Sequence, residues 1–294
     1  MDLWIIATCF AAAVQTLRFA LQRRLRGTGL STGGATFARF LWAVPIAWGA
    51  AILVTGGEMP ALGADFWPWA VLGGLCQIVA TFATITLFSL RSFAVGIAFT
   101  KTETIQVALF SALVLGEAVS QTGLVAILTG MAGVIALSWP QEGWRGGWLT
   151  RATGLGVLAG GLFGLSAIGY RAATLAVGSD QALTRALVAL AAVTLFQTLA
   201  LGLWLMWRER GEVGRVITRW RHTLPVGVAG VAGSAGWFLA FALQNAAYVR
   251  SFGQIELLFS LCVSVIWFRE TPRCCDVIGM ALLALSIVGI LYAA

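Results

Sequence analysis

Long apolar runs follow one another along almost the whole chain, and no other feature of the sequence constrains the fold as strongly. Each run has about 17 to 25 residues, the length that a helix needs to cross roughly 30 Å of hydrocarbon. Hydrophobic residues make up 59% of the chain and charged residues 11%, whereas soluble domains carry roughly 25% charged residues. The sequence therefore predicts an all-α integral membrane protein.

The apolar runs and the Gly, Pro and polar breaks between them predict ten transmembrane helices. We expect these helices at residues 3–22, 34–54, 67–89, 93–115, 121–139, 154–176, 181–206, 224–247, 251–268 and 275–293. The first run lacks a basic segment and a cleavage site, so it predicts a retained helix and not a signal peptide. The polar stretch 208–222 carries five arginines and predicts a solvated loop.

Positive charges are distributed unevenly between the predicted loops. With ten helices, 13 arginines fall in alternate loops, which lie on one side of the membrane: Arg23, Arg24, Arg26, Arg91, Arg145, Arg151, Arg208, Arg210, Arg215, Arg219, Arg221, Arg269 and Arg273. Because arginine-rich loops stay in the cytoplasm, we expect a multi-pass protein of the cell inner membrane with both termini on the non-cytoplasmic side. This topology also explains the net charge of +7 without nucleic-acid binding, for which no motif is present.

The two halves of the chain are similar to each other. A shift of 153 residues places Glu103 on Glu256 and Glu117 on Glu270. Internal similarity of this kind is typical of transporters built from repeats. We therefore predict a first repeat at 1–139, a connecting loop at 140–153 and a second repeat at 154–294. Because five helices is an odd number, the two repeats must be inserted with opposite orientations.

Short motifs at the end of each half resemble those of a known transporter family. Leu115-Gly-Glu117 is followed by Gly123, Gly130 and Gly133, and Phe268-Arg-Glu270 is followed by Gly279 and Gly289. With the repeat order, these stretches resemble the ten-helix EamA-type branch of the drug/metabolite transporter superfamily. The resemblance covers nearly the whole chain. It implies a carrier of a small metabolite whose fourth helix in each repeat lines a central cavity.

Ionisable residues inside two of the apolar runs are the strongest candidates for a functional site. Lys101, the only lysine in the chain, and Glu103 lie within the run 93–115. A charge at the centre of the bilayer costs roughly 2.5 to 3.5 kcal/mol on insertion scales, and it commonly marks a substrate or ion path. On a continuous helix, Thr100, Glu103 and Gln106 share a face, and Lys101 lies about 200° from Glu103. We therefore predict a polar wall that lines a cavity.

The second half offers a matching set of polar residues. Arg250 and Gln254 are spaced to share one helix face, and Glu256 occupies the position equivalent to Glu103. We expect all of these residues to bind substrate, with Glu103 and Glu256 as candidates for coupling transport to protons. The alternative is that the charges pair with one another or with an arginine of another helix only to hold the bundle together.

Four other charged residues are assigned structural roles. Glu117 and Glu270 are expected to cap the next helix, because a carboxylate satisfies exposed N–H groups there. Arg39 and Arg185 lie near predicted helix ends, where bracing the fold or reaching the interface is favoured over substrate contact.

Known catalytic motifs are absent from the sequence. It contains no Walker A motif, H-E-x-x-H motif or dinucleotide-binding fingerprint, and the five cysteines lack metal-ligand spacing. We therefore expect neither an enzyme nor a cofactor or metal. The predicted function is secondary transport of an amino acid, amine or similar metabolite by alternating access, in a monomer or a homodimer. The alternative is an intramembrane enzyme or lipid-handling protein that uses the cavity for an amphipathic headgroup.

Overall fold

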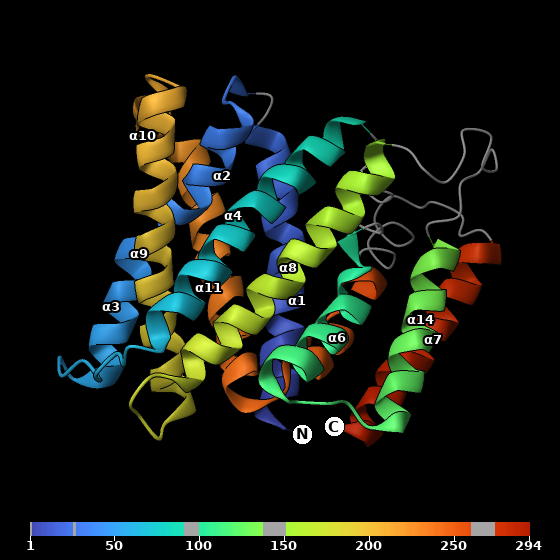
Figure 1. Ribbon diagram of the computed structural model, residues 1–294. Helices are drawn as coiled ribbons and strands as arrows, with labels where there is room; N and C mark the ends of the chain where they lie inside the picture. The colour runs from blue at the N-terminus through green and yellow to red at the C-terminus, as the bar shows by residue number, and fades with distance from the viewer. Residues whose placement is uncertain (1, 26–27, 91–99, 138–150, 260–273) are drawn as a thin grey trace.

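The structure, a computed structural model, describes residues 2–25, 28–90, 100–137, 151–259 and 274–294 (Figure 1). Within these residues the chain is helical and contains no β-strand. The helices are α1 (Leu3–Leu25), α2 (Thr32–Leu41), α3 (Ala43–Thr55), α4 (Phe66–Leu90), α6 (Glu103–Leu115), α7 (Gln121–Leu137), α8 (Arg151–Leu175), α9 (Ala182–Arg208), α10 (Glu212–Thr218), α11 (Trp220–Leu243), α12 (Ala246–Phe252) and α14 (Cys274–Ala293).

Six helical segments in the described part of the chain are long and apolar enough to cross a membrane. They are Thr32–Thr55, Phe66–Leu87, Thr153–Leu175, Ala182–Arg208, Trp220–Leu243 and Cys274–Ala293. Leu53, Leu113 and Leu203 are among the many large apolar side chains that point outward, which is favourable only where the surroundings are apolar. The chain is therefore a multi-pass membrane protein.

The observed helices agree closely with most of the ranges predicted from the sequence. The largest difference lies at 251–268, where the structure places α12 earlier, at Ala246–Phe252. The side chain of Asn245 accepts a hydrogen bond from the backbone N–H of Ala247 at 2.7 Å, so an N-cap starts a new helix where a continuous one was expected. Residues 91–99, 260–273 and most of the predicted connecting loop 140–153 lie outside the described residues.

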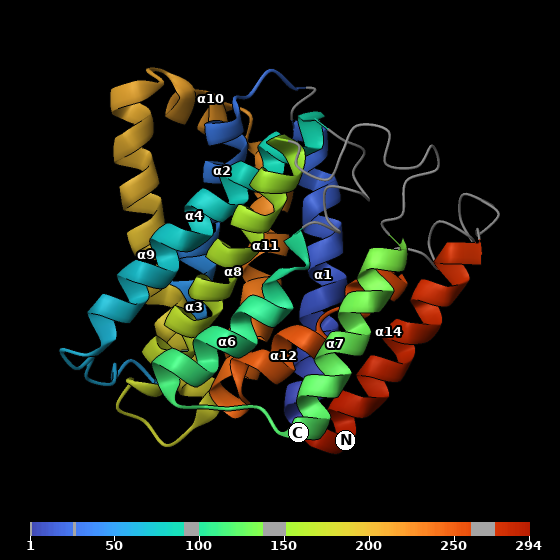
Figure 2. The same cartoon turned by 45° about the vertical axis from the view of Figure 1, so that its right-hand side comes forward.

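The helices pack in pairs around a common interior. α4 packs along α8, α1 along α11, and α7 along α14. The α7–α14 pair stands at one side of the bundle, and both termini lie at the end opposite α10 (Figures 1 and 2). Glycines allow α7 and α14 to approach closely, since a Cβ atom at Gly133 would lie 2.9 Å from the backbone oxygen of Gly279.

A break between α2 and α3 divides one membrane span into two helices. α2 ends at Leu41 and α3 begins at Ala43. Pro45 has no N–H to donate to the carbonyl four residues earlier, so the hydrogen-bond ladder is interrupted at this point. The break places Arg39 in the last turn of α2, inside the span Thr32–Thr55 and not at its end.

The start of α2 is held by acidic residues from the segment 208–222. The hydroxyl of Ser31 accepts a hydrogen bond from the N–H of Gly34, and the N–H of Ser31 donates to Oε1 of Glu212 at 2.6 Å. Ser31 also donates its hydroxyl proton to Glu209. The prediction of a solvated loop is therefore wrong here, because α10 buries Glu212 and Val216 against α2.

Replacing Glu212 with alanine is expected to destabilise the protein. The change removes the acceptor of the Ser31 N–H and a negative charge near the positive end of the α2 dipole. The loss is expected to be about 1 to 3 kcal/mol of unfolding free energy, measured by thermal unfolding in detergent. Glu58→Ala, at an exposed loop position, is the control and should unfold like the wild type. Equal unfolding midpoints for Glu212→Ala and Glu58→Ala would contradict this account.

Candidate functional site

Two short helix breaks in the interior carry the charged residues of the candidate site. Thr100 is helical, Lys101 and Thr102 form a turn, and α6 begins at Glu103. In the second half α12 ends at Phe252, Gly253 and Gln254 form a turn, and residues 255–259 are again helical. The two breaks occupy nearly equivalent positions in the two predicted repeats.

The charges at each break suit the helix ends that they occupy. Arg250 lies in the last turn of α12, where exposed carbonyl groups favour a cation. Glu103 lies in the first turn of α6, where free N–H groups favour an anion. Lys101 follows the helical residue Thr100, and Glu256 lies near the start of the helical residues 255–259. Each break therefore has a cation on its carbonyl side and a carboxylate on its N–H side.

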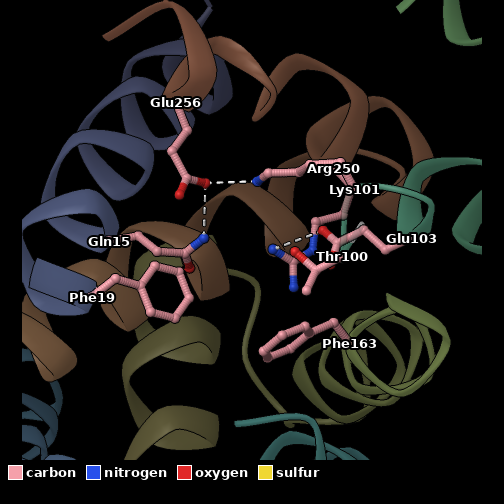
Figure 3. Close-up of a pocket in the computed structure, with 8 residues that line it drawn as sticks. All are labelled: Gln15, Phe19, Thr100, Lys101, Glu103, Phe163, Arg250 and Glu256. Atoms are coloured by element: carbon pink, nitrogen blue, oxygen red, sulfur yellow. Dashed lines mark hydrogen bonds and ion pairs between the residues drawn. The ribbon is translucent and has the colours of Figure 1, made fainter. Parts of the chain in front are cut away.

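The four charges form two ion pairs that connect the two breaks (Figure 3). Nζ of Lys101 lies 2.7 Å from Oε2 of Glu256, and both side chains are at least nine-tenths buried. Nη1 of Arg250 lies 3.5 Å from Oε1 of Glu103, again with both side chains buried. Each cation thus binds the carboxylate of the other break. The pairing that was considered between Lys101 and Glu103 does not occur.

Side chains of α1 and α11 support these ion pairs. Gln15 donates from Nε2 to Oε2 of Glu256 at 3.1 Å and accepts at Oε1 from the indole N–H of Trp237 at 3.0 Å. The guanidinium of Arg250 lies over the Trp237 ring, 4.7 Å from the ring centroid. Trp237 also fills the space beside Gly253, where a Cβ atom would lie 2.5 Å from the indole. The second break is therefore packed tightly against α11.

A small pocket lies between the ion pairs, α1 and α8. Its lining residues are Gln15, Phe19, Thr100, Lys101, Glu103, Phe163, Arg250 and Glu256 (Figure 3). The space that the centre of a water-sized molecule can occupy is about 20 Å³, which is enough for about one water molecule. In this conformation the side chains themselves fill most of the site.

Five of the seven predicted substrate-binding residues line this pocket, and two do not. Gln106 donates to the hydroxyl of Thr102 and to the carbonyl of Val157, so it faces α8. Oε1 of Gln254 instead lies 3.0 Å from the position of a Cβ atom at Gly130, on the α7 side. Gln254 lies in the turn of the second break, so its side chain does not follow the face that a continuous helix would give it. Gln106 shares the helix α6 with Glu103, but its amide extends to α8 and not into the pocket.

Several buried polar atoms near the second break lack a hydrogen-bond partner among the residues that the structure describes. They are Nε of Arg250, the hydroxyl of Ser251 and both amide atoms of Gln254. Leaving such groups unpaired costs about 1 to 3 kcal/mol each. Polar groups of this kind can bind water or the polar groups of a ligand.

Arg39 belongs to a second polar cluster deeper in the bundle. Its guanidinium donates to the hydroxyls of Thr81 and Ser234, both at 3.4 Å. In the amide orientation that satisfies its neighbours, Gln77 accepts from both Nη atoms of Arg39 at 2.9 and 3.1 Å. Of the two structural roles expected for Arg39, these buried contacts fit bracing of the fold and not a position at the membrane interface.

Glu117 and Arg185, which were predicted to have structural roles near helix ends, bind partners in other parts of the chain. The carboxylate of Glu117 receives hydrogen bonds from Nε of Arg171 at 2.7 and 2.9 Å, and Ser120 accepts the N–H of Gly123 at the start of α7. The predicted capping role of Glu117 is thus taken by Ser120. Arg185 donates to the carbonyl oxygens of Ser179 and Ala242, while Glu270 lies outside the described residues.

Arg171 connects three parts of the molecule. Its Nε and Nη2 donate to Glu117, in the loop after α6, and its Nη1 donates to the carbonyl oxygens of Phe241 and Gln244, where α11 ends.

Three side chains that line the pocket were missed by the sequence reasoning: Gln15, Phe19 and Phe163. Trp237, which binds Gln15, was one of five deep tryptophans for which the sequence favoured lipid or core contact over a cavity. Only Gln15 could have been found from the sequence, because a glutamine within an apolar run indicates a polar contact inside the membrane. Phe19 and Phe163 do not stand out among the other apolar residues of their runs.

Within the described ranges, no group of three or more His, Cys, Asp or Glu residues is arranged to hold a metal ion. The pocket lining offers amide, ammonium, guanidinium and carboxylate groups. These groups can bind a polar ligand by charge-assisted hydrogen bonds.

Comparisons with known proteins give information on the fold. No protein-family model matches the chain, and a search of curated proteins found no match. A solved structure described as "Crystal structure of protein" is similar to it, with a TM-score of 0.66 and 17% sequence identity. The similarity covers 97% of this chain and 99% of the other. The overall fold is therefore shared with a protein of experimentally determined structure.

Proposed function

We propose that this chain is a secondary transporter that carries a small polar metabolite across a membrane by alternating access. The observation that supports this most strongly is the pair of crossed ion pairs, Lys101–Glu256 and Arg250–Glu103, at two helix breaks inside a membrane protein. Discontinuous helices with charged or polar groups at the break are a recurrent device in transporters, where they bind substrate and coupling ions near the midplane.

The architecture that accompanies this proposal is the one expected from the sequence. It has ten helices in two inverted repeats, with Glu103 and Glu256 at equivalent positions and both termini outside the cytoplasm. The two breaks, each followed by a glutamate, support the repeat relation. The positions of the termini, opposite the arginine-containing α10, support the orientation. Membership of the EamA-type family and residence in the inner membrane belong to the same proposal.

The ion pairs suggest how the empty carrier is held closed. In a buried pair each charge compensates the desolvation of the other, so the pocket needs no ligand to be neutralised locally. A charged group of the substrate replaces one member of an ion pair as the partner of the other member. The side chain that is released no longer holds the two breaks together, which favours the conformation that opens to the other side of the membrane. The energy for this change comes from the difference in substrate affinity between the two states.

Glu103 and Glu256 are the proposed proton-coupling residues. Protonation of either carboxylate removes one ion pair, which links proton binding to the conformation of the breaks. Glu103→Gln is expected to retain binding but to abolish the pH dependence of uptake into proteoliposomes. Full pH-dependent transport by this variant would remove Glu103 from the coupling mechanism.

Ligand-induced thermal stabilisation of the purified protein tests the proposed site. The panel contains amino acids, amines, phosphorylated metabolites and lipids, and wild type is compared with Lys101→Ala and Glu103→Gln. We expect at least one polar metabolite to raise the unfolding temperature of the wild type but not that of Lys101→Ala, whereas Glu103→Gln keeps the binding and is stabilised like the wild type. Equal stabilisation of all three proteins by a ligand would show that Lys101 and Glu103 stabilise the fold and do not bind the substrate.

A lipid-handling function is the second candidate, favoured by one observation. An apolar surface groove runs between α1 and α11, lined by Val14, Leu17, Leu21, Leu224, Pro225, Val228, Ala229 and Ala232. A lipid substrate needs such a lateral opening, whereas a soluble metabolite needs water access from both sides in turn. Labelling of single cysteines at positions 99 to 106 by polar reagents from either aqueous side would support the carrier.

A further inference from the structure

The buried charges around the pocket do not balance. Four buried cations, Arg18, Arg39, Lys101 and Arg250, share this region with the buried carboxylates Glu103 and Glu256. The other two buried carboxylates of the described residues, Glu212 and Asp276, lie in the first turns of α10 and α14. The two ion pairs use Lys101 and Arg250 together with Glu103 and Glu256, so among the described residues Arg18 and Arg39 have no carboxylate at ion-pair distance.

Arg18 has neutral neighbours on its own helix. Its Nη1 donates to Oε1 of Gln22 at 2.6 Å, and its guanidinium lies over the ring of Phe19, 4.1 Å from the centroid. Phe19 also lines the pocket. The ring of Phe19 therefore lies between the guanidinium of Arg18 and the pocket that the ion pairs line.

Arg39 is bound by hydroxyl and amide groups, and it lies close to Arg18. A Cβ atom at Gly230 of α11 would be 2.9 Å from Cγ of Arg39 and 3.7 Å from Cδ of Arg18, so both arginine stems pack over the same glycine. Among the described residues, no carboxylate comes within ion-pair distance of either guanidinium. Arg18 interacts electrostatically with Arg39, Arg250 and Glu256, and Arg39 with Arg250.

Desolvated guanidinium groups bound only to neutral partners are costly. Burying a cation is expensive unless it is paired, and two such cations side by side also repel each other. Guanidinium groups are suited to planar or tetrahedral oxyanions, because their N–H donors form bidentate hydrogen bonds with carboxylate and phosphate. An anion at this position would remove the imbalance.

We infer that the substrate is a small organic anion whose carboxylate or phosphate group binds to Arg18 and Arg39, with Lys101 and Arg250 at the adjoining pocket. This inference rests on the proposed transport function and narrows its substrate class. Simple amines are excluded as substrates, because they would add a third excess positive charge. The small pocket corresponds to the unloaded state, and movement of Phe19 opens it toward the two arginines.

The test compares ligands of different charge on one protein. Thermal stabilisation and uptake into proteoliposomes are measured at constant ionic strength with succinate, glycerol 3-phosphate, inorganic phosphate, alanine and putrescine. The variants are Arg18→Gln, Arg39→Gln and the charge-conserving Arg39→Lys. The control is Arg185→Gln, which removes an arginine bound to loop and helix-end carbonyls away from the pocket. Succinate and glycerol 3-phosphate distinguish a carboxylate from a phosphate preference.

We expect an organic anion to stabilise and be transported by wild type, Arg185→Gln and, with lower affinity, Arg39→Lys. Each glutamine variant should weaken its binding about tenfold to 100-fold. Selective transport of alanine or putrescine, lost in Lys101→Ala, would overturn the anion inference and leave the transport proposal intact. Failure of every compound, with wild type folded, would reject both. If a glutamine variant does not fold, the ligands are ranked by the stabilisation and uptake they give with wild type and Arg39→Lys. Anions ranking above alanine and putrescine in both proteins support the anion inference, and the reverse order overturns it.

Discussion

Replacing either partner of the Lys101–Glu256 ion pair is expected to destabilise the protein by about 3 to 5 kcal/mol, because the remaining charge stays buried without its partner. The two atoms lie 2.7 Å apart and Glu256 is fully buried. Lys101→Met leaves a buried carboxylate without the ammonium group at 2.7 Å, and Glu256→Gln leaves an ammonium facing a neutral amide. Denaturant titration in detergent micelles would measure both changes.

The double variant Lys101→Met, Glu256→Gln is expected to recover most of this stability. Removing both charges together avoids an unpaired buried ion, and replacing a buried pair with neutral groups is often neutral or stabilising. If the pair serves transport, the double variant should be as stable as wild type and inactive in substrate counterflow. A stable and active double variant would make the pair structural.

Gly160→Ala is expected to destabilise the protein strongly for the addition of a single methyl group to α8. A Cβ atom at this position would lie 2.8 Å from the carbonyl oxygen of Thr100, 2.8 Å from the hydroxyl of Thr102 and 3.1 Å from the N–H nitrogen of Glu103. Two of these atoms belong to the backbone of the first helix break, so they cannot move aside independently. The expected loss is about 1 to 3 kcal/mol, with weaker substrate binding because α8 displaces Glu103.

Gly154 provides a matched control on the same helix. A Cβ atom there meets nothing within 4 Å, so alanine should stabilise the helix by up to about 1 kcal/mol. The two substitutions are chemically identical and are expected to change the unfolding temperature in opposite directions. Equal effects would show that α8 does not pack against the break as described.

The positions of the helices could be predicted from the sequence because a span has only to be apolar and long enough. The ranges expected for α4, α8, α9 and α14 differ from the observed ones by few residues. The short α10 was missed for a physical reason: its polar sequence resembles a solvated loop. What orders it is the burial of Glu212 at the start of α2, a contact between residues far apart in the chain.

The candidate site was found from the cost of placing Lys101 and Glu103 in a membrane, but its geometry was not predictable in the same way. Helical periodicity assigned Gln106 and Gln254 to the cavity. Gln106 instead donates to the Val157 carbonyl of α8, and Gln254, in the turn of the second break, lies on the α7 side. The pairing of each cation with the opposite break depends on tertiary packing. The arginines Arg18 and Arg39 lie near predicted helix ends, so nothing in the pattern indicated their burial.

The contacts of Arg171 make one end of the bundle cooperative. A single guanidinium binds the loop after α6, through Glu117, and the last carbonyl groups of α11, while its own backbone belongs to α8. Separating any one of these three elements from the others breaks charge-assisted hydrogen bonds shared with the rest. This end of the molecule, where both termini lie, should consequently open in an all-or-none step and not by gradual loosening of one helix.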